Sequence, residues 1–151
     1  KIDDMLTERR TRFGNTAINK TGSMMTAIKI LSDGGLLGIL SDVNSQARSG
    51  VFVPFFGVPA CTAVGAALMA IRSTSLIYPT FCVWNKETQR YKFIHGRLIE
   101  PTITGNLEND ILKTTADYTA EIETIIRQYP DQWMWIHKRW KTRPPGERSI
   151  Y

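Results

Sequence analysis

Two short runs of apolar residues set the first constraint on the fold. Residues 36–40 and 76–84 contain no charged side chain and are shorter than an ordinary helix. Such runs are typical of strands that are buried on both faces of a sheet. Residues 90–99 alternate enough to pair with the second run as a hairpin across residues 85–89. We therefore expect both runs to be adjacent central strands, with Ile39 buried.

Helical patterns alternate with these runs along the chain. Residues 23–32 put Met24, Ala27, Ile28 and Leu31 on one face, and residues 62–72 are rich in Ala and Gly. A longer helical face steps through Leu107, Ile111, Tyr118, Ile122, Ile125 and Tyr129. With a further short strand expected at residues 12–19, the alternation favours an α/β fold with a mainly parallel sheet flanked by helices. A chain of 151 residues that is 42% hydrophobic suffices for a single domain over residues 1–151.

A polar loop follows the first apolar run, where ligands usually bind in parallel α/β sheets. Asp42 stands where the expected strand ends, and Arg48 follows in a loop that closes with Ser49 and Gly50. Arg48 has the fork of donors that pairs with phosphate or carboxylate, and Ser49-Gly50 can add backbone donors. An ordinary solvated loop would have the same composition.

Residues 129–147 combine aromatic rings with cations. Three of the four tryptophans lie here with His137 and four basic side chains, before a Pro-Pro-Gly sequence. This mixture suits a boundary between apolar material and anionic groups. The net charge of +5 likewise favours an acidic partner: nucleic acid, an anionic membrane surface or an acidic carrier protein. A nucleic-acid-binding domain is the alternative class, although no RNP, KH or zinc-finger pattern is present.

The two cysteines do not have the spacing of a metal site. Cys82 lies in an apolar run and Cys61 precedes the small-residue helix, so we expect two buried free thiols and no metal. The longest stretch of low charge, residues 58–71, is shorter than the roughly 20 residues that cross a bilayer.

Four segments together carry a resemblance to a known family. Residues 50–60 read Gly-Val-Phe-Val-Pro-Phe-Phe-Gly-Val-Pro-Ala, and residues 10–14, 40–42 and 133–147 fall in the same order along the chain. These motifs resemble those of the lipid A biosynthesis acyltransferases, the lauroyl and myristoyl transferases. The resemblance implies a fold similar to that of glycerolipid acyltransferases. It also implies transfer of a fatty acyl chain from acyl carrier protein to a hydroxyl of a lipid A precursor, without a cofactor, at the cytoplasmic face of the inner membrane.

The family uses an HxxxxD/E motif, in which the His is the general base. His95 and Glu100 have this spacing, but they lie in an expected strand, where residues five apart point to opposite faces. His137 has no acidic residue five positions later and could instead pin the carboxyl-terminal segment. The true base and its acidic partner are therefore expected upstream of Lys1, and the membrane anchor in a segment missing from this chain. The chain would then be the carboxyl-terminal part of an acyltransferase, inactive alone; a non-catalytic scaffold of the same fold is the other possibility.

The resemblance also implies roles for particular side chains. Arg10 and Asp42 are the expected catalytic residues, although Arg12 fits the family's arginine nearly as well. The expected substrate-binding residues are Arg12, Arg48, His137 and Arg139. We expect Arg10, Asp42 and Arg48 to line one concave positive surface. Trp133, Trp135, Arg139 and Trp140 would lie at a membrane-facing rim or, alternatively, pack in the core.

Overall fold

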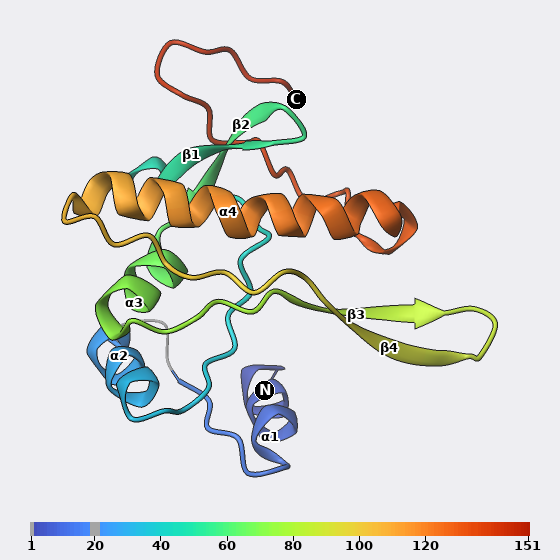
Figure 1. Ribbon diagram of the computed structural model, residues 1–151. Helices are drawn as coiled ribbons and strands as arrows, with labels where there is room; N and C mark the ends of the chain where they lie inside the picture. Colours follow the sequence, from blue (N-terminus) through green and yellow to red (C-terminus); the bar gives the residue numbers. More distant parts are fainter. Residues whose placement is uncertain (1, 19–21) are drawn as a thin grey trace.

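The computed structural model describes residues 2–18 and 22–151. Within them lie four α-helices: α1 (Ile2–Thr11), α2 (Met24–Ser32), α3 (Gly65–Ser73) and α4 (Leu107–Gln128) (Figure 1). Two short 3₁₀ turns, η1 (Ala47–Ser49) and η2 (Pro130–Gln132), precede the first strand and follow the last helix. None of these helices is long and apolar enough to cross a membrane.

The strands form two separate antiparallel hairpins. β1 (Gly50–Phe55) pairs with β2 (Val58–Ala63) through a two-residue turn, in which Phe56 and Gly57 both have positive φ, the backbone of the tightest hairpins. β3 (Thr80–Asn85) pairs with β4 (Arg90–His95), and the Asn85 side chain accepts hydrogen bonds from the next turn's backbone. The second hairpin confirms the pairing predicted across residues 85–89.

The predicted mainly parallel sheet is wrong. Both two-stranded sheets are antiparallel, because each joins strands that a short turn reverses. Residues 36–40 form no strand, and Leu36 and Ile39 are 98% and 45% exposed. The expectation that Ile39 is buried at the centre of a sheet is therefore also wrong. An apolar run forms a buried strand only if it pairs with another strand, and neither hairpin pairs with this run.

A strand at residues 12–19 is likewise absent from the described part, residues 12–18, where a turn follows α1; residue 19 lies outside it. The Ala- and Gly-rich helix begins at Gly65 instead of Thr62, because residues up to Ala63 belong to β2. Cys61 therefore lies in β2, where it is buried and free. Cys82 is free but exposed, contrary to expectation, because β3 and β4 extend away from the helices (Figure 1).

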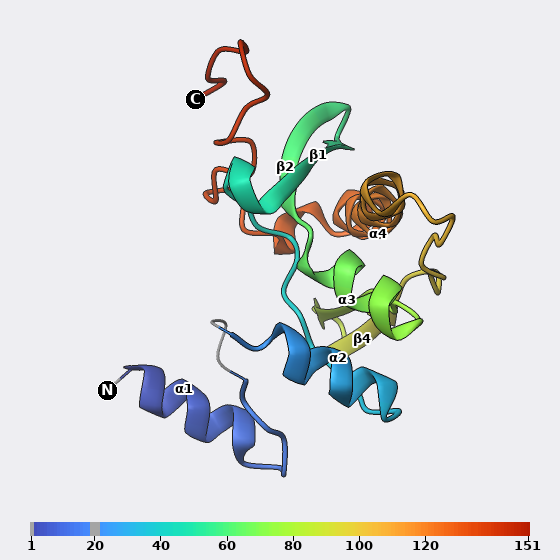
Figure 2. The same cartoon turned by 90° about the vertical axis from the view of Figure 1, so that its left-hand side faces the viewer.

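The core forms where α4 lies across the β1–β2 hairpin and α3 (Figures 1 and 2). The Asn106 side chain caps α4 by accepting from the Asn109 backbone N–H. The helix spans nearly the predicted residues. Tyr118, Ile122 and Ile125 of the predicted face are buried, which confirms the periodicity over most of the helix, whereas Leu107 at its start is 43% exposed. The buried cluster contains Phe55, Ala60, Ala67, Ile99, Tyr118, Ile122 and Ile126.

Exposure of the 36–40 segment predicts self-association. Extended apolar backbone without a strand partner is a template for pairing with another chain. We expect the double variant Leu36→Lys/Leu40→Lys to shift the sedimentation profile towards monomer. Its free energy of unfolding should change by less than about 1 kcal/mol, because both side chains are exposed.

The control is Met25→Lys/Ile150→Lys, which adds the same charge at two other exposed apolar positions. If both double variants reduce association equally, net charge is the cause and the 36–40 segment has no special role.

Candidate functional site

Residues 129–147, hereafter the docked segment, are held against the β1–β2 hairpin. The chain reverses after α4 and runs back to this hairpin (Figure 1). Near its end, the Trp140 indole N–H donates to the Phe55 carbonyl at 3.3 Å and Arg143 donates to the Pro59 carbonyl at 2.6 Å. These contacts join residues more than eighty positions apart, so the segment is fixed by tertiary contacts rather than by local structure.

Arg139 is the most deeply buried part of the docked segment, at 1% exposure. Its guanidinium donates to the Cys61 carbonyl at 2.9 Å and to the Thr62 hydroxyl at 2.6 Å, and it lies 5.0 Å from the centre of the Phe55 ring. Within the described residues no carboxylate forms an ion pair with it. Desolvation by burial lowers the pKa of Arg139, and the nearby acidic groups, Tyr118 first and then Asp42, oppose that shift.

The loop of residues 42–45 makes a second set of contacts with the docked segment. The Trp133 indole N–H donates to the Asp42 carboxylate at 3.2 Å. The Asn44 backbone N–H donates to His137 Nε2 at 2.8 Å, which requires that this nitrogen carry a lone pair. The Asn44 side chain exchanges hydrogen bonds with the side chain and backbone of Thr142, at 3.0 and 3.1 Å.

Aromatic rings fill the space between these polar anchors. Phe55 lies 5.6 Å from Trp133 and 5.7 Å from Trp140, measured between ring centres. Trp133 contacts Trp135 edge to face at 4.7 Å. Trp133 and Trp140 are partly buried against the core, while Trp135 is half exposed. Of the rings predicted for the rim or the core, two pack against the core and one is half exposed.

Tyr118 is a buried residue of α4 that lies next to the Arg139 site. Its hydroxyl donates to the Ala63 carbonyl at 3.0 Å, beside the β2 residues that bind Arg139. Burial raises the pKa of Tyr118 to about 12, against the smaller opposing effects of a hydrogen bond with Thr115 and of the Arg139 charge. The phenol is therefore neutral at ordinary pH and serves as a donor.

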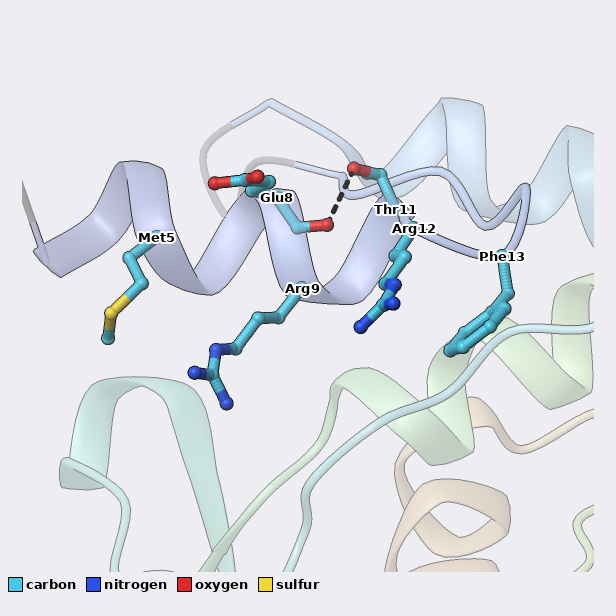
Figure 3. A pocket seen from close by; sticks show the side chains of 6 residues that line it. All are labelled: Met5, Glu8, Arg9, Thr11, Arg12 and Phe13. Carbon is cyan, nitrogen blue, oxygen red and sulfur yellow. Dashed lines mark hydrogen bonds between the residues drawn. The ribbon is translucent and has the colours of Figure 1, made fainter.

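A second feature, the α1 hollow, lies along α1 and the turn after it. This hollow of about 790 Å³ is lined by Met5, Glu8, Arg9, Thr11, Arg12 and Phe13. Figure 3 shows Arg9 and Arg12 extending to the same side of the helix as Met5 and Phe13, while the Glu8 carboxylate points away from them. The Arg12 guanidinium lies 5.6 Å from the Phe13 ring centre. Two cations between two apolar side chains suit an anionic amphiphile.

The structure separates the residues that were predicted to form one site. Asp42, His137 and Arg139 meet around the docked segment, and Arg48 is exposed on η1 close to the same hairpin. Arg10 and Arg12 lie on or next to α1, which stands apart from the hairpin in both views (Figures 1 and 2). The three-residue surface of Arg10, Asp42 and Arg48 is not formed. Asp42 is bonded to Trp133, and Arg10 does not line the α1 hollow. The functional roles assigned to these residues stay predictions.

Three residues of the site were not predicted from the sequence: Asn44 and Thr62, which bind the docked segment, and Tyr118, which bonds to β2 beside it. Tyr118 was recognised only as a core residue, and its hydroxyl at a buried position was the signal that a polar partner was needed. Nothing in the local sequence pairs Asn44 with His137 or Thr62 with Arg139. In the part of the chain that the structure covers, no cluster of three or more His, Cys, Asp or Glu side chains could hold a metal ion.

Comparison with known proteins identifies the class to which this arrangement belongs. The model of the family of bacterial lipid A biosynthesis acyltransferases matches residues 1–142. The chain therefore belongs to the lipid A biosynthesis acyltransferase family, and the resemblance predicted from its motifs is confirmed.

Individual relatives agree with the family match. The chain is 30% identical to a lipid A biosynthesis lauroyltransferase of Escherichia coli, over 99% of the chain and 48% of the relative. It is 30% identical to a lipid A biosynthesis acyltransferase of Haemophilus influenzae, over 97% of the chain and 44% of the relative. The lipid A biosynthesis myristoyltransferase of E. coli is 26% identical, over 94% and 43%. The chain thus spans less than half the length of these relatives.

The raised pKa of Tyr118 predicts a loss of stability in alkali. Between pH 10 and about 12 the unfolded chain has released this proton while the folded chain keeps it, so the free energy of unfolding falls as pH rises. Over about two pH units the loss is about 3 kcal/mol. Urea unfolding at pH 9 to 12 measures it, and Tyr118→Phe should show a shallower decline. Equal slopes for both proteins would exclude Tyr118 as the source.

Burial of Arg139 predicts that docking depends on its guanidinium. Arg139→Ala would leave the buried Thr62 hydroxyl without a donor and would remove one of the two donors to the Cys61 carbonyl, which keeps that of the Ser45 backbone N–H. With the lost packing against Phe55, we expect the free energy of unfolding to fall by about 2–4 kcal/mol. Arg139→Lys should recover only part of this loss, because an ammonium cannot reproduce the fork. Chemical denaturation measures both, with exposed Arg148→Ala as the control. An Arg139→Ala effect no larger than that of Arg148→Ala would contradict this role.

Proposed function

We propose that this chain takes part in the transfer of a fatty acyl chain from acyl carrier protein to a hydroxyl of a lipid A precursor, at the cytoplasmic face of the bacterial inner membrane. The observation that carries the proposal is the family match over residues 1–142. Relatives matched along the chain are a lauroyl-, a palmitoleoyl- and a myristoyltransferase. Because these relatives transfer different acyl chains, the proposal leaves the acyl length open.

Neither histidine is poised as the general base that such a transfer requires. His95 ends β4, where it stacks on Tyr78 at 4.8 Å and its Nδ1 lies 3.2 Å from the Thr80 hydroxyl. No hydrogen bond or ion pair is found between the described residues His95 and Glu100. The Nε2 lone pair of His137 already accepts from Asn44. We therefore propose that neither His95 nor His137 supplies the base.

The α1 hollow is the better-placed site for an anionic substrate. Arg9 and Arg12 extend to the same side of α1, and neither forms an ion pair with another described residue (Figure 3). Guanidinium pairs well with phosphate, and the apolar ends of the hollow, Met5 and Phe13, suit attached hydrocarbon. This favours Arg12 over Arg10 as the family's arginine and adds Arg9 to the binding residues.

A transfer assay tests the proposal with lauroyl-acyl carrier protein and a phosphorylated lipid A precursor. The 151-residue chain should show no turnover. It should nevertheless bind the precursor in a calorimetric titration. Arg12→Ala should weaken that binding at least about tenfold, the scale of one charge-assisted hydrogen bond, and Arg10→Ala should weaken it less.

Turnover that disappears with His95→Ala would overturn the assignment of the histidines. Precursor binding that is the same for Arg12→Ala and the unaltered chain would remove the α1 hollow as the binding site, while leaving family membership intact.

A further inference from the structure

Residues 134–136, hereafter the 134–136 loop, expose three apolar side chains in succession. Met134, Trp135 and Ile136 are 67%, 50% and 89% exposed. They lie between Trp133 and Arg139, both of which bind other parts of the chain. Contiguous exposed apolar groups on an otherwise well-anchored segment mark a site that contacts another apolar phase.

The backbone holds this loop in a fixed shape. Trp135 N–H donates to the Trp133 carbonyl at 3.0 Å and His137 N–H to the Met134 carbonyl at 3.1 Å. The Trp135 indole N–H donates to the Pro130 carbonyl at 2.6 Å. Consecutive turns therefore present the apolar side chains outward, and the indole needs no external partner for its polar group. A preorganised loop loses little conformational entropy when its side chains enter an apolar phase.

Basic side chains lie directly after the loop. Lys138 and Lys141 are exposed, and neither forms an ion pair with a carboxylate elsewhere in residues 2–18 and 22–151. The Lys138 ammonium lies 5.5 Å from the centre of the Tyr151 ring, a neutral partner that does not cancel its charge. Apolar side chains next to cations are the two signals that together give stable attachment to an anionic bilayer surface.

We propose that the 134–136 loop inserts its apolar side chains into the surface of a bilayer with anionic headgroups, with Lys138 and Lys141 at the level of those headgroups. The proposal rests on the proposed function only for the general location at a membrane, and it identifies which residues make the contact. A projecting loop suits a bilayer surface better than a protein partner, because it offers protruding side chains and no groove that would receive a complementary segment.

The three tryptophans predicted for a membrane-facing rim differ in exposure. Trp133 bonds to Asp42, Trp140 bonds to the Phe55 carbonyl, and both pack against the core, so neither is free to contact a membrane. Trp135 is the only one of the three with half its surface exposed, and Phe56 lies 5.9 Å from it between ring centres. The membrane contact therefore involves Trp135 and its two neighbours, not the whole aromatic cluster.

Vesicle flotation tests the proposal with the 151-residue chain and no acyl donor. Vesicles of phosphatidylglycerol and phosphatidylethanolamine supply the anionic surface, and phosphatidylcholine vesicles supply a neutral one. We expect binding to the anionic vesicles, at least tenfold weaker binding for Met134→Ser/Ile136→Ser, and about fivefold weaker binding for each of Lys138→Gln and Lys141→Gln. Unchanged melting temperatures establish that the variants fold, as expected for exposed side chains.

The matched control is Met25→Ser/Leu76→Ser, which removes two exposed apolar side chains outside both the loop and residues 36–40 and should bind vesicles like the unaltered chain. Equal loss with the control variant would overturn the loop as a specific site. Vesicle binding that is unchanged in Met134→Ser/Ile136→Ser would overturn it as well. If that variant instead changes only the sedimentation coefficient, the loop is a protein interface and the proposal is wrong. Failure of acyl transfer alone affects the proposed function and leaves this result untouched.

Discussion

The buried Arg139 guanidinium is the interaction on which the organisation of the molecule depends. It donates to two β2 residues, Cys61 and Thr62, and it lies against the Phe55 ring. Burying a charge is costly unless its hydrogen-bonding groups are satisfied, and here one nitrogen, Nε, has no partner. The cost is offset by the two hydrogen bonds from the other nitrogens and by the cation–π contact with Phe55.

Around that cation, three regions distant in the sequence become one unit. Asn44 and Asp42 bind His137 and Trp133, across more than ninety positions, and Trp140 reaches Phe55 across eighty-five. Such contacts carry a loop-closure cost that local structure does not repay, so the docked segment depends on the surface that β1, β2 and α4 provide.

The sequence predicted what local pattern can encode. The long helical face ending near Tyr129 and the hairpin across residues 85–89 follow from periodicity and turn chemistry, and the motifs at residues 50–60 and 133–147 led to the family. The strand predicted at residues 36–40 is absent. An apolar run indicates that burial would be favourable, but it does not identify the strand with which the run would pair. The predicted surface of Arg10, Asp42 and Arg48 is not formed; Asp42 instead lies with His137 and Arg139, a grouping that was not predicted from the sequence. Arg10 and Arg12 lie apart from these residues on or next to α1. The local sequence could not predict this separation, because it does not specify where α1 lies relative to the rest of the fold.

Because Arg139 bonds to neutral partners, added salt should weaken its contacts less than those of an exposed ion pair. Exposed ion pairs such as Lys86–Asp131 are screened by added electrolyte, because their attraction acts through water. A guanidinium enclosed in protein and bonded to a carbonyl and a hydroxyl has no such dependence. The docked segment therefore keeps its place in concentrated salt, where peripheral charge pairs have lost most of their attraction. A high-salt wash that strips electrostatically attached proteins from a surface would leave the interior of this molecule assembled.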